Sequence, residues 1–106
     1  MVVMTEIPDK LSALSTHSDN ADDTRLVERF KCGDGSAFDR IVSEHAADVQ
    51  VLAGRLLGWD GEVADVVQEV FLAAFLGLKR FKGRSSLRTW LYSITINKCR
   101  NHRRRR

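Results

Sequence analysis

Apolar residues recur at helical spacing in four segments of the chain, and turn-forming residues separate these segments. In the first segment an Asp or Thr cap, starting from Asp22, leads into Leu26, Val27 and Phe30. Gly33 then supplies a stop signal. The pattern predicts a short first helix.

A second helix is predicted from Ser36 to about Gly58. Ser36 is the expected N-cap, and Asp39 stands three residues later as its capping-box partner. Apolar residues and one histidine share a face of this segment: Phe38, Ile41, Val42, His45, Val49, Leu52 and Leu56. This face is predicted to enter the core.

The third segment carries the widest apolar strip, which predicts a central helix packed against two neighbours. Asp60 is its expected cap, and the strip reaches Phe81: Val63, Val66, Val67, Val70, Phe71, Ala74, Leu78 and Phe81. Residues 82–86, KGRSS, interrupt the pattern. Ser85 or Ser86 is expected to cap a fourth helix whose apolar residues are Leu87, Trp90, Leu91 and Ile94.

The expected fold class is therefore all-α, a compact bundle of about four helices over residues 22–106. Residues 1–21 are rich in Ser, Thr, Asp and Asn without sustained periodicity. Such a segment cannot bury enough apolar surface to offset the entropy of ordering, so we expect a flexible N-terminal tail.

Charge is distributed unevenly along the chain. Residues 79–106 contain eleven Lys and Arg and no acid, although the net charge of the whole chain is only +3. Solvated faces usually mix both signs, so this segment favours a polyanionic partner, nucleic acid.

Several classes of protein are disfavoured. Uncharged runs such as Val70–Leu78 are too short to span a bilayer. The N-terminus lacks the pattern of a secretory signal, so a cytoplasmic location is expected. Cys32 and Cys99 have no zinc-ligand spacing and suggest no disulfide framework.

The sequence gives little support for a catalytic site or a metal site. The histidines are scattered, no nucleophile setting is recognisable, and glycines occur singly rather than in a phosphate-binding loop. We expect no enzyme activity and no cofactor. Glu44, His45 and Asp48 are conceivable metal ligands, but His45 lies on the apolar face, where a core histidine is the better interpretation, so no metal site is predicted.

The third segment has a second stripe that its core strip does not use, formed by Asp65, Glu69, Leu72 and Leu76 with Gln68 alongside. Carboxylates continuing into leucines suit a partner that offers arginines beside an apolar ledge. In the alternative interpretation the acids are solvated and the leucines pack under the N-terminal helix. Periodicity alone does not separate the two.

Aromatic and basic residues interleave after Phe81, a mixture suited to single-stranded nucleic acid. Cations neutralise phosphates, rings stack on bases, and polar loop groups read a flipped base. Arg88 and Tyr92 lie four residues apart on one helix face. Trp90 is better interpreted as core, Tyr92 as a binding residue.

Three stretches together resemble region two of extracytoplasmic-function sigma factors: LVERFKCGDGSAFDRIVSEH, DVVQEVFLAAFLGLKRFKG and SLRTWLYSITINKCRNHRRR. The resemblance covers residues 26–104. Its most specific parts are D-x-V-Q-E-x-F at residues 65–71 and L-R-T-W-L-Y at residues 87–92.

The resemblance implies a domain that binds core RNA polymerase and captures the non-template strand of the promoter minus-ten element. The expected contacts to the clamp coiled coil of the beta-prime subunit are Asp65, Gln68, Glu69, Leu72 and Leu76. The loop at residues 82–86 would hold a flipped base while the fourth helix lines the strand. The expected DNA-binding residues are Phe81, Lys82, Arg84, Ser85, Ser86, Arg88, Trp90, Tyr92, Asn97, Lys98, Arg100 and Arg103.

An anti-sigma protein is a further partner that the resemblance implies. The family's second domain, a helix-turn-helix that reads the minus-thirty-five element, is expected to be absent from this chain. Two rival hypotheses remain: a helical protein-interaction module whose basic C-terminus binds nucleic acid nonspecifically, and an amphipathic membrane-surface helix at residues 87–106.

Overall fold

The computed structural model describes residues 21–58 and 62–105. Residues 21–31 form the first helix. It is followed by α2 (Gly35–Leu57), α3 (Glu62–Gly77), the short 3₁₀ helix η1 (Leu78–Arg80) and α4 (Leu87–Arg105). The described residues contain no strand, which confirms the predicted all-α class. None of these helices is long and apolar enough to cross a membrane.

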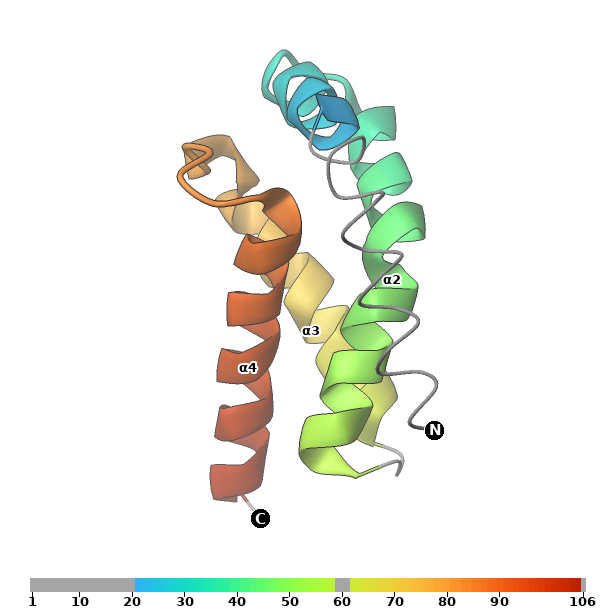
Figure 1. Cartoon of the computed structure of the whole chain (residues 1–106), viewed down its shortest axis with the longest axis vertical. Coiled ribbons are helices and arrows are strands. Elements are labelled where there is room, and N and C mark those ends of the chain that lie inside the picture. The colour runs from blue at the N-terminus through green and yellow to red at the C-terminus, as the bar shows by residue number, and fades with distance from the viewer. Residues whose placement is uncertain (1–20, 59–61, 106) are drawn as a thin grey trace.

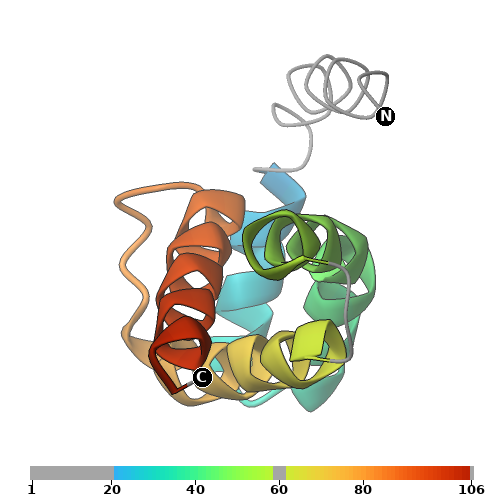
Figure 2. The same cartoon turned by 90° about the horizontal axis from the view of Figure 1, so that it is seen from below.

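The three long helices form a bundle in which each contacts the other two. Successive helices run in opposite directions, and α3 crosses behind α2 and α4 (Figure 1). The first helix lies across the end of the bundle where α2 and α4 begin (Figure 2). The segment between η1 and α4 lies at that same end (Figure 1), so residues far apart in sequence meet there.

The first helix ends as its sequence predicts, since Gly33 adopts a φ of 103° that favours glycine. Residue 21 is already helical, so the helix starts at least one residue before the predicted Asp22. The expected tail falls, apart from residue 21, on residues that lie outside the described part of the chain.

The predicted cap of α2 was wrong by two residues. Asp34, not Ser36, is the N-cap, and its carboxylate accepts a hydrogen bond from the Ser36 backbone N–H at 3.0 Å. The Ser36 hydroxyl and the Arg29 guanidinium also donate to this carboxylate. These hydrogen bonds, those from Ser36 first, lower the pKa of Asp34. At the other end Gly58, with a φ of 84°, terminates α2 near the predicted position.

The core side of α2 follows a spacing of four residues. Its buried residues are Ala37, Ile41, His45, Val49, Ala53, Gly54 and Leu57. Phe38, Val42 and Leu56, which were predicted on this face, lie at its border and are partly buried. The small residues Ala37 and Ala53, near the two ends of α2, are fully buried, and α2 contacts both α3 and α4.

The third predicted helix is interrupted near its end. The α-helix stops at Gly77 and the chain tightens into η1, with Phe81 as its C-cap. A Cβ atom at Gly77 would lie 3.4 Å from the Trp90 ring, an ordinary van der Waals contact, so the ring packs beside this glycine. The predicted cap Asp60 lies outside the described residues.

The start of α4 resolves the choice between two serines. The Thr89 backbone N–H donates to Ser86 Oγ at 3.1 Å, and that hydroxyl donates to Thr89 Oγ1 at 3.0 Å. Ser86 is therefore the residue that caps α4. Ser85 donates its hydroxyl to the Ser86 carbonyl instead.

Candidate nucleic-acid interface and docking face

Two hydrogen bonds and one glycine shape the connection between η1 and α4, residues 82–86. The Phe81 N–H closes η1 on the Leu78 carbonyl. Lys31 Nζ, fifty residues earlier, donates to the Phe81 carbonyl at 2.6 Å. Gly83 takes a φ of 75°, which turns the chain toward the Ser86 cap. Both ends of this capture loop (residues 82–86) are thus held by hydrogen bonds, while its middle is exposed.

Two hollows lie beside the capture loop. The inner pocket, about 240 Å³, lies between the loop and the first helix; its lining residues are Asp23, Thr24, Val27, Phe81, Gly83, Ser85, Ser86 and Leu87. The outer pocket, about 430 Å³, is basic and aromatic; its lining residues are Arg80, Phe81, Lys82, Arg84, Ser85 and Trp90. All the predicted binding residues from Phe81 to Ser86 line one or both pockets.

Trp90 has two roles rather than one. Its ring packs on Phe81 with the ring centroids 5.0 Å apart and belongs to the border of the core. The same side chain lines the outer pocket. The ring therefore packs against the core and still contributes to the surface of a hollow, as a stacking platform requires.

Arg88 and Tyr92, which their spacing places on one helix face, are both partly covered. Arg88 lies 3.3 Å from Asp48 of α2, and only 18% of its side chain is exposed. Tyr92 is half-buried. Helical spacing placed these residues on one face, but the neighbouring helix covers much of it.

The remaining predicted DNA-binding residues lie toward the C-terminal end of α4. Asn97, Arg100 and Arg103 are exposed and Lys98 is half-buried. A basic groove of about 470 Å³ is found here, lined by Leu56, Ile96, Cys99, Arg100, Arg103 and Arg104. Arg100 follows Arg88 by twelve positions along the helix, which is roughly 18 Å. The predicted set therefore divides into a loop cluster and a distal basic cluster.

The outward side of α3 carries the second stripe of the sequence. Asp65 and Gln68 are exposed, and Leu72 and Leu76 are 61% and 66% exposed. Phe75, beside the leucines, is the residue that packs toward the first helix and α2, in edge contacts with Phe30 and Phe38. The leucines are thus not packed under the first helix. We call Asp65, Gln68, Leu72 and Leu76 the α3 outer face.

Glu69 lies at the border of this face, is half-buried, and contacts His102 of α4. Its Oε2 lies 3.0 Å from Nε2 of His102 in α4. His102 Nδ1 also lies 3.8 Å from Glu62 Oε1. In the free domain Glu69 therefore contributes to the contact between α3 and α4.

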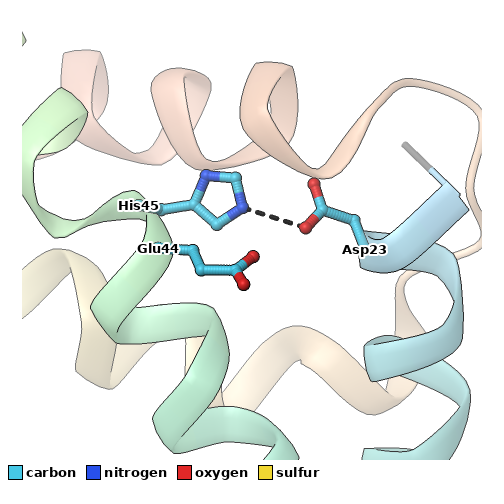
Figure 3. A group of neighbouring side chains, drawn as sticks. All are labelled: Asp23, Glu44 and His45. Carbon is cyan, nitrogen blue, oxygen red and sulfur yellow. Dashed lines mark hydrogen bonds and ion pairs between the residues drawn. The ribbon is translucent and has the colours of Figure 1, made fainter. Parts of the chain in front are cut away.

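The residues that could hold a metal ion differ from those considered in the sequence: Asp23 takes the place of Asp48 beside Glu44 and His45. Asp48 pairs with Arg88, whereas Asp23 joins Glu44 and His45, with ligand atoms all within 4.8 Å of one another. Figure 3 shows the Asp23 and His45 side chains facing each other across the gap between the first helix and α2, with Oδ1 and Nε2 3.1 Å apart.

Two features favour a structural Asp–His hydrogen bond over a metal centre. Glu44 is held by Arg40 at 2.8 Å. His45 Nδ1 is buried without a hydrogen-bond partner, whereas a metal-bound histidine normally has one to orient its ring. The residues present fit a metal ion poorly.

The comparisons with known proteins decide the family. The model of the family described as Sigma-70 region 2 matches residues 41–106, more than half of the chain. The chain belongs to this family.

The curated relatives of this sigma-70 region 2 domain are named as sigma factors. The RNA polymerase sigma-H factor of Pseudomonas aeruginosa is 41% identical over 80 residues, covering 76% of this chain and 42% of that protein. The ECF RNA polymerase sigma-E factor of Escherichia coli K12 is 40% identical over 85 residues, covering 80% of this chain and 44% of that protein. The chain thus spans less than half the length of these relatives, and it is an extracytoplasmic-function type of region 2.

Two solved structures share the fold. An engineered region 2 of sigmaE in complex with GTAAAA superposes with a TM-score of 0.70 at 39% identity, covering 76% of this chain and 83% of that one. CnrH in complex with the cytosolic domain of CnrY gives a TM-score of 0.69 at 31% identity, covering 76% and 52%.

The sequence pattern did not predict that the first helix of this sigma-70 region 2 domain lines the inner pocket. Asp23, Thr24 and Val27 were treated only as the start of a helix, yet they line the pocket. Their local spacing carries no signal for this role, because the pocket exists only where the first helix crosses the end of the bundle.

Proposed function

We propose that this chain is the part of a sigma factor that docks on core RNA polymerase and captures the single-stranded non-template strand of the promoter minus-ten element. The carrying observation is the capture loop, held at both ends and flanked by two hollows. A flipped base needs such a concave site beside basic and aromatic groups.

The DNA-binding mechanism is capture without chemistry. Phe81 and Trp90 offer ring surface, while Lys82 and Arg84 supply positive charge for the phosphates. The distal basic cluster, around Arg100, would contact phosphates further along the strand. Because these groups bind unstacked bases, they shift the duplex toward its melted state.

The α3 outer face is the proposed polymerase contact. The exposed carboxylate of Asp65 and the exposed carboxamide of Gln68 stand about one to three helical turns before Leu72 and Leu76. Charge can steer and orient the partner while the two leucines bury apolar surface. Glu69 would join the contact at its border. The expected partner surface is the beta-prime clamp coiled coil.

An anti-sigma partner is also proposed, because the structurally similar CnrH was solved with a bound protein, CnrY. The relation to DNA is supported in the same way by the sigmaE region 2 complex with GTAAAA. The exposed apolar residues Leu72, Phe75 and Leu76 are the surface that a protein partner of either kind would cover first.

The deciding experiment compares binding of a labelled promoter-like single strand with binding of its duplex, using fluorescence anisotropy. We expect tighter binding of the single strand. Lys82→Ala should weaken it and reduce the salt dependence, by about 0.7 in log-log slope for one lost phosphate contact. Lys79→Ala is the matched control, since Lys79 is exposed but lines neither pocket.

Equal affinity for single strand and duplex would contradict base capture. In that case the basic C-terminal segment binds nucleic acid nonspecifically, and the domain is a protein-interaction module that uses the α3 outer face. Equal effects of the two lysine variants would show that the capture loop has no special role.

A further inference from the structure

His102 lies on the buried side of α4, near the C-terminal end of that helix. Leu91, Thr95 and Cys99 are each at most 1% exposed and follow one another at a spacing of four residues, and His102 comes three residues later. Helical spacing of this kind turns all four side chains toward the same neighbours. The His102 side chain is accordingly only 14% exposed, so its ring has little freedom to move.

Two carboxylates of α3 face the two nitrogens of this ring. Glu62 and Glu69 are seven positions apart, about two helical turns, and so share one side of α3. His102 Nε2 lies 3.0 Å from Glu69 Oε2, whereas Nδ1 lies 3.8 Å from Glu62 Oε1. Only the first distance is that of a hydrogen bond. A carboxylate accepts and does not donate, so Nε2 carries the hydrogen and holds Glu69.

Glu69 also belongs to the outward stripe of α3. It comes four residues after Asp65 and three before Leu72, and residues at these spacings are neighbours on a helix surface. Its side chain is 36% exposed. A carboxylate has acceptor sites for several hydrogen bonds, so one that accepts from His102 can also accept from an arginine of a docked partner.

The hydrogen bond to His102 changes what docking requires of Glu69. A glutamate side chain loses much rotamer freedom when a partner fixes it, and this loss opposes binding. In this domain a ring that is itself largely buried already restricts the glutamate. A partner therefore meets a carboxylate that is ordered before docking, next to the exposed leucines of the α3 outer face.

We propose that His102 of α4 is a positioning residue for polymerase docking, which acts by holding the Glu69 carboxylate at the border of the α3 outer face. This inference rests on the proposed docking of that face on core RNA polymerase. His102 itself does not touch the polymerase. It makes the position of Glu69, on one helix, depend on the C-terminal end of α4.

The test titrates the fluorescently labelled full chain with bacterial core RNA polymerase and compares variants of His102. His102→Ala should raise Kd by about two- to tenfold, the factor expected when one long side chain must be ordered on binding. Asn101→Ala is the matched control, because Asn101 is the exposed neighbour of His102 on the same helix. It should bind like the wild type.

Two further substitutions separate the two ring nitrogens. The amide of His102→Gln can take the place of Nε2 and donate to Glu69, so this variant should keep nearly wild-type affinity. The shorter side chain of His102→Asn places its amide where Nδ1 was, toward Glu62, and should bind as weakly as His102→Ala. A residue that only fastened α4 to α3 would not produce this difference.

A double-mutant cycle tests whether His102 acts through Glu69. Glu69→Ala should weaken polymerase binding by itself. In the Glu69→Ala background the additional His102→Ala substitution should change Kd by less than about 1.5-fold, because the side chain that His102 positions is already absent. A full additional effect of His102→Ala in that background would overturn the proposed route.

The remaining outcomes distinguish this inference from the proposed docking. Unchanged or tighter polymerase binding by His102→Ala, with helix content intact by circular dichroism, overturns the positioning role and leaves docking standing. Should His102→Ala fail to fold, the comparison of His102→Gln with His102→Asn decides, and equal affinities of these two variants overturn the inference. Absence of polymerase binding by the wild-type chain overturns the proposed docking and the inference with it.

Discussion

The α3 outer face provides the sharpest quantitative prediction. We consider the double variant Leu72→Ala, Leu76→Ala. The two side chains are 61% and 66% exposed in the free domain, so truncation should leave the core unchanged. The free energy of unfolding should change by no more than about 0.5 kcal/mol. Any larger effect on partner binding must then arise at the interface.

The magnitude follows from the area that a partner can still cover. Full burial of a leucine side chain is worth about 1.5–3 kcal/mol. Covering the exposed part, about two thirds of each side chain, is therefore worth about 1–2 kcal/mol per leucine. If the two contributions add, the variant loses about 2–4 kcal/mol of binding free energy, which is about 30-fold to several hundredfold in Kd.

The assay is a titration of fluorescently labelled domain with bacterial core RNA polymerase, measured by anisotropy. Ile96→Ala is the control, because Ile96 is another exposed apolar residue, 39% accessible, but lies on α4. It should bind like the wild type. A change in Kd below about threefold for the double variant, which is under 1 kcal/mol, would refute docking through the two leucines.

The remaining predictions concern charge, capping and the thiols. If about five phosphates are contacted, the affinity for single-stranded DNA should fall with salt at a log-log slope near roughly −3.5, and a flat response would exclude a phosphate track. Asp34→Ala should lower the midpoint of thermal unfolding at pH 7, because Asp34 caps α2. The folded-state pKa of Asp34 is lowered, so its contribution is present above the unfolded-state pKa and disappears as the pH falls through the folded-state value. The difference from wild type should therefore vanish in acid, while Asp39→Ala, on the exposed side of α2, should have little effect at either pH. Finally, Cys32 is exposed and Cys99 is buried, with burial raising the pKa of the Cys99 thiol. A thiol reagent should therefore modify one cysteine rapidly and the second only after unfolding; rapid modification of both would contradict the described core.

Much of the fold follows from local sequence because helix periodicity and capping are local properties. The spacing of apolar residues predicted four helices, and the glycines at positions 33 and 58 marked two ends correctly. The error at the start of α2 has a local cause as well. Asp34 and Ser36 are comparable N-cap residues, and Arg29, on the preceding helix, supports the aspartate with a charged hydrogen bond. The sequence pattern alone does not predict that Arg29 donates to Asp34 rather than leaving Ser36 as the cap.

Some of the candidate functional residues could be identified from the sequence, and the surroundings of others depend on how the helices pack. The capture loop and the two leucines of the α3 outer face were identified from sequence, because a break in periodicity and a second stripe are visible along one segment. Their roles as binding residues remain predictions. Sequence spacing placed Arg88 on one helix face with Tyr92, but its ion pair with Asp48 depends on how α4 packs against α2.

The sequence by itself determined the helices, the basic C-terminal segment and the family of this domain, since these depend on residue types at short spacing. Tertiary structure alone decided that Asp23 meets His45, that Lys31 holds the Phe81 carbonyl, and that the first helix closes the inner pocket. The two hydrogen bonds join residues 22 and 50 positions apart. They arise when the helices bury their apolar faces against one another, and the position of each polar group then follows from that packing.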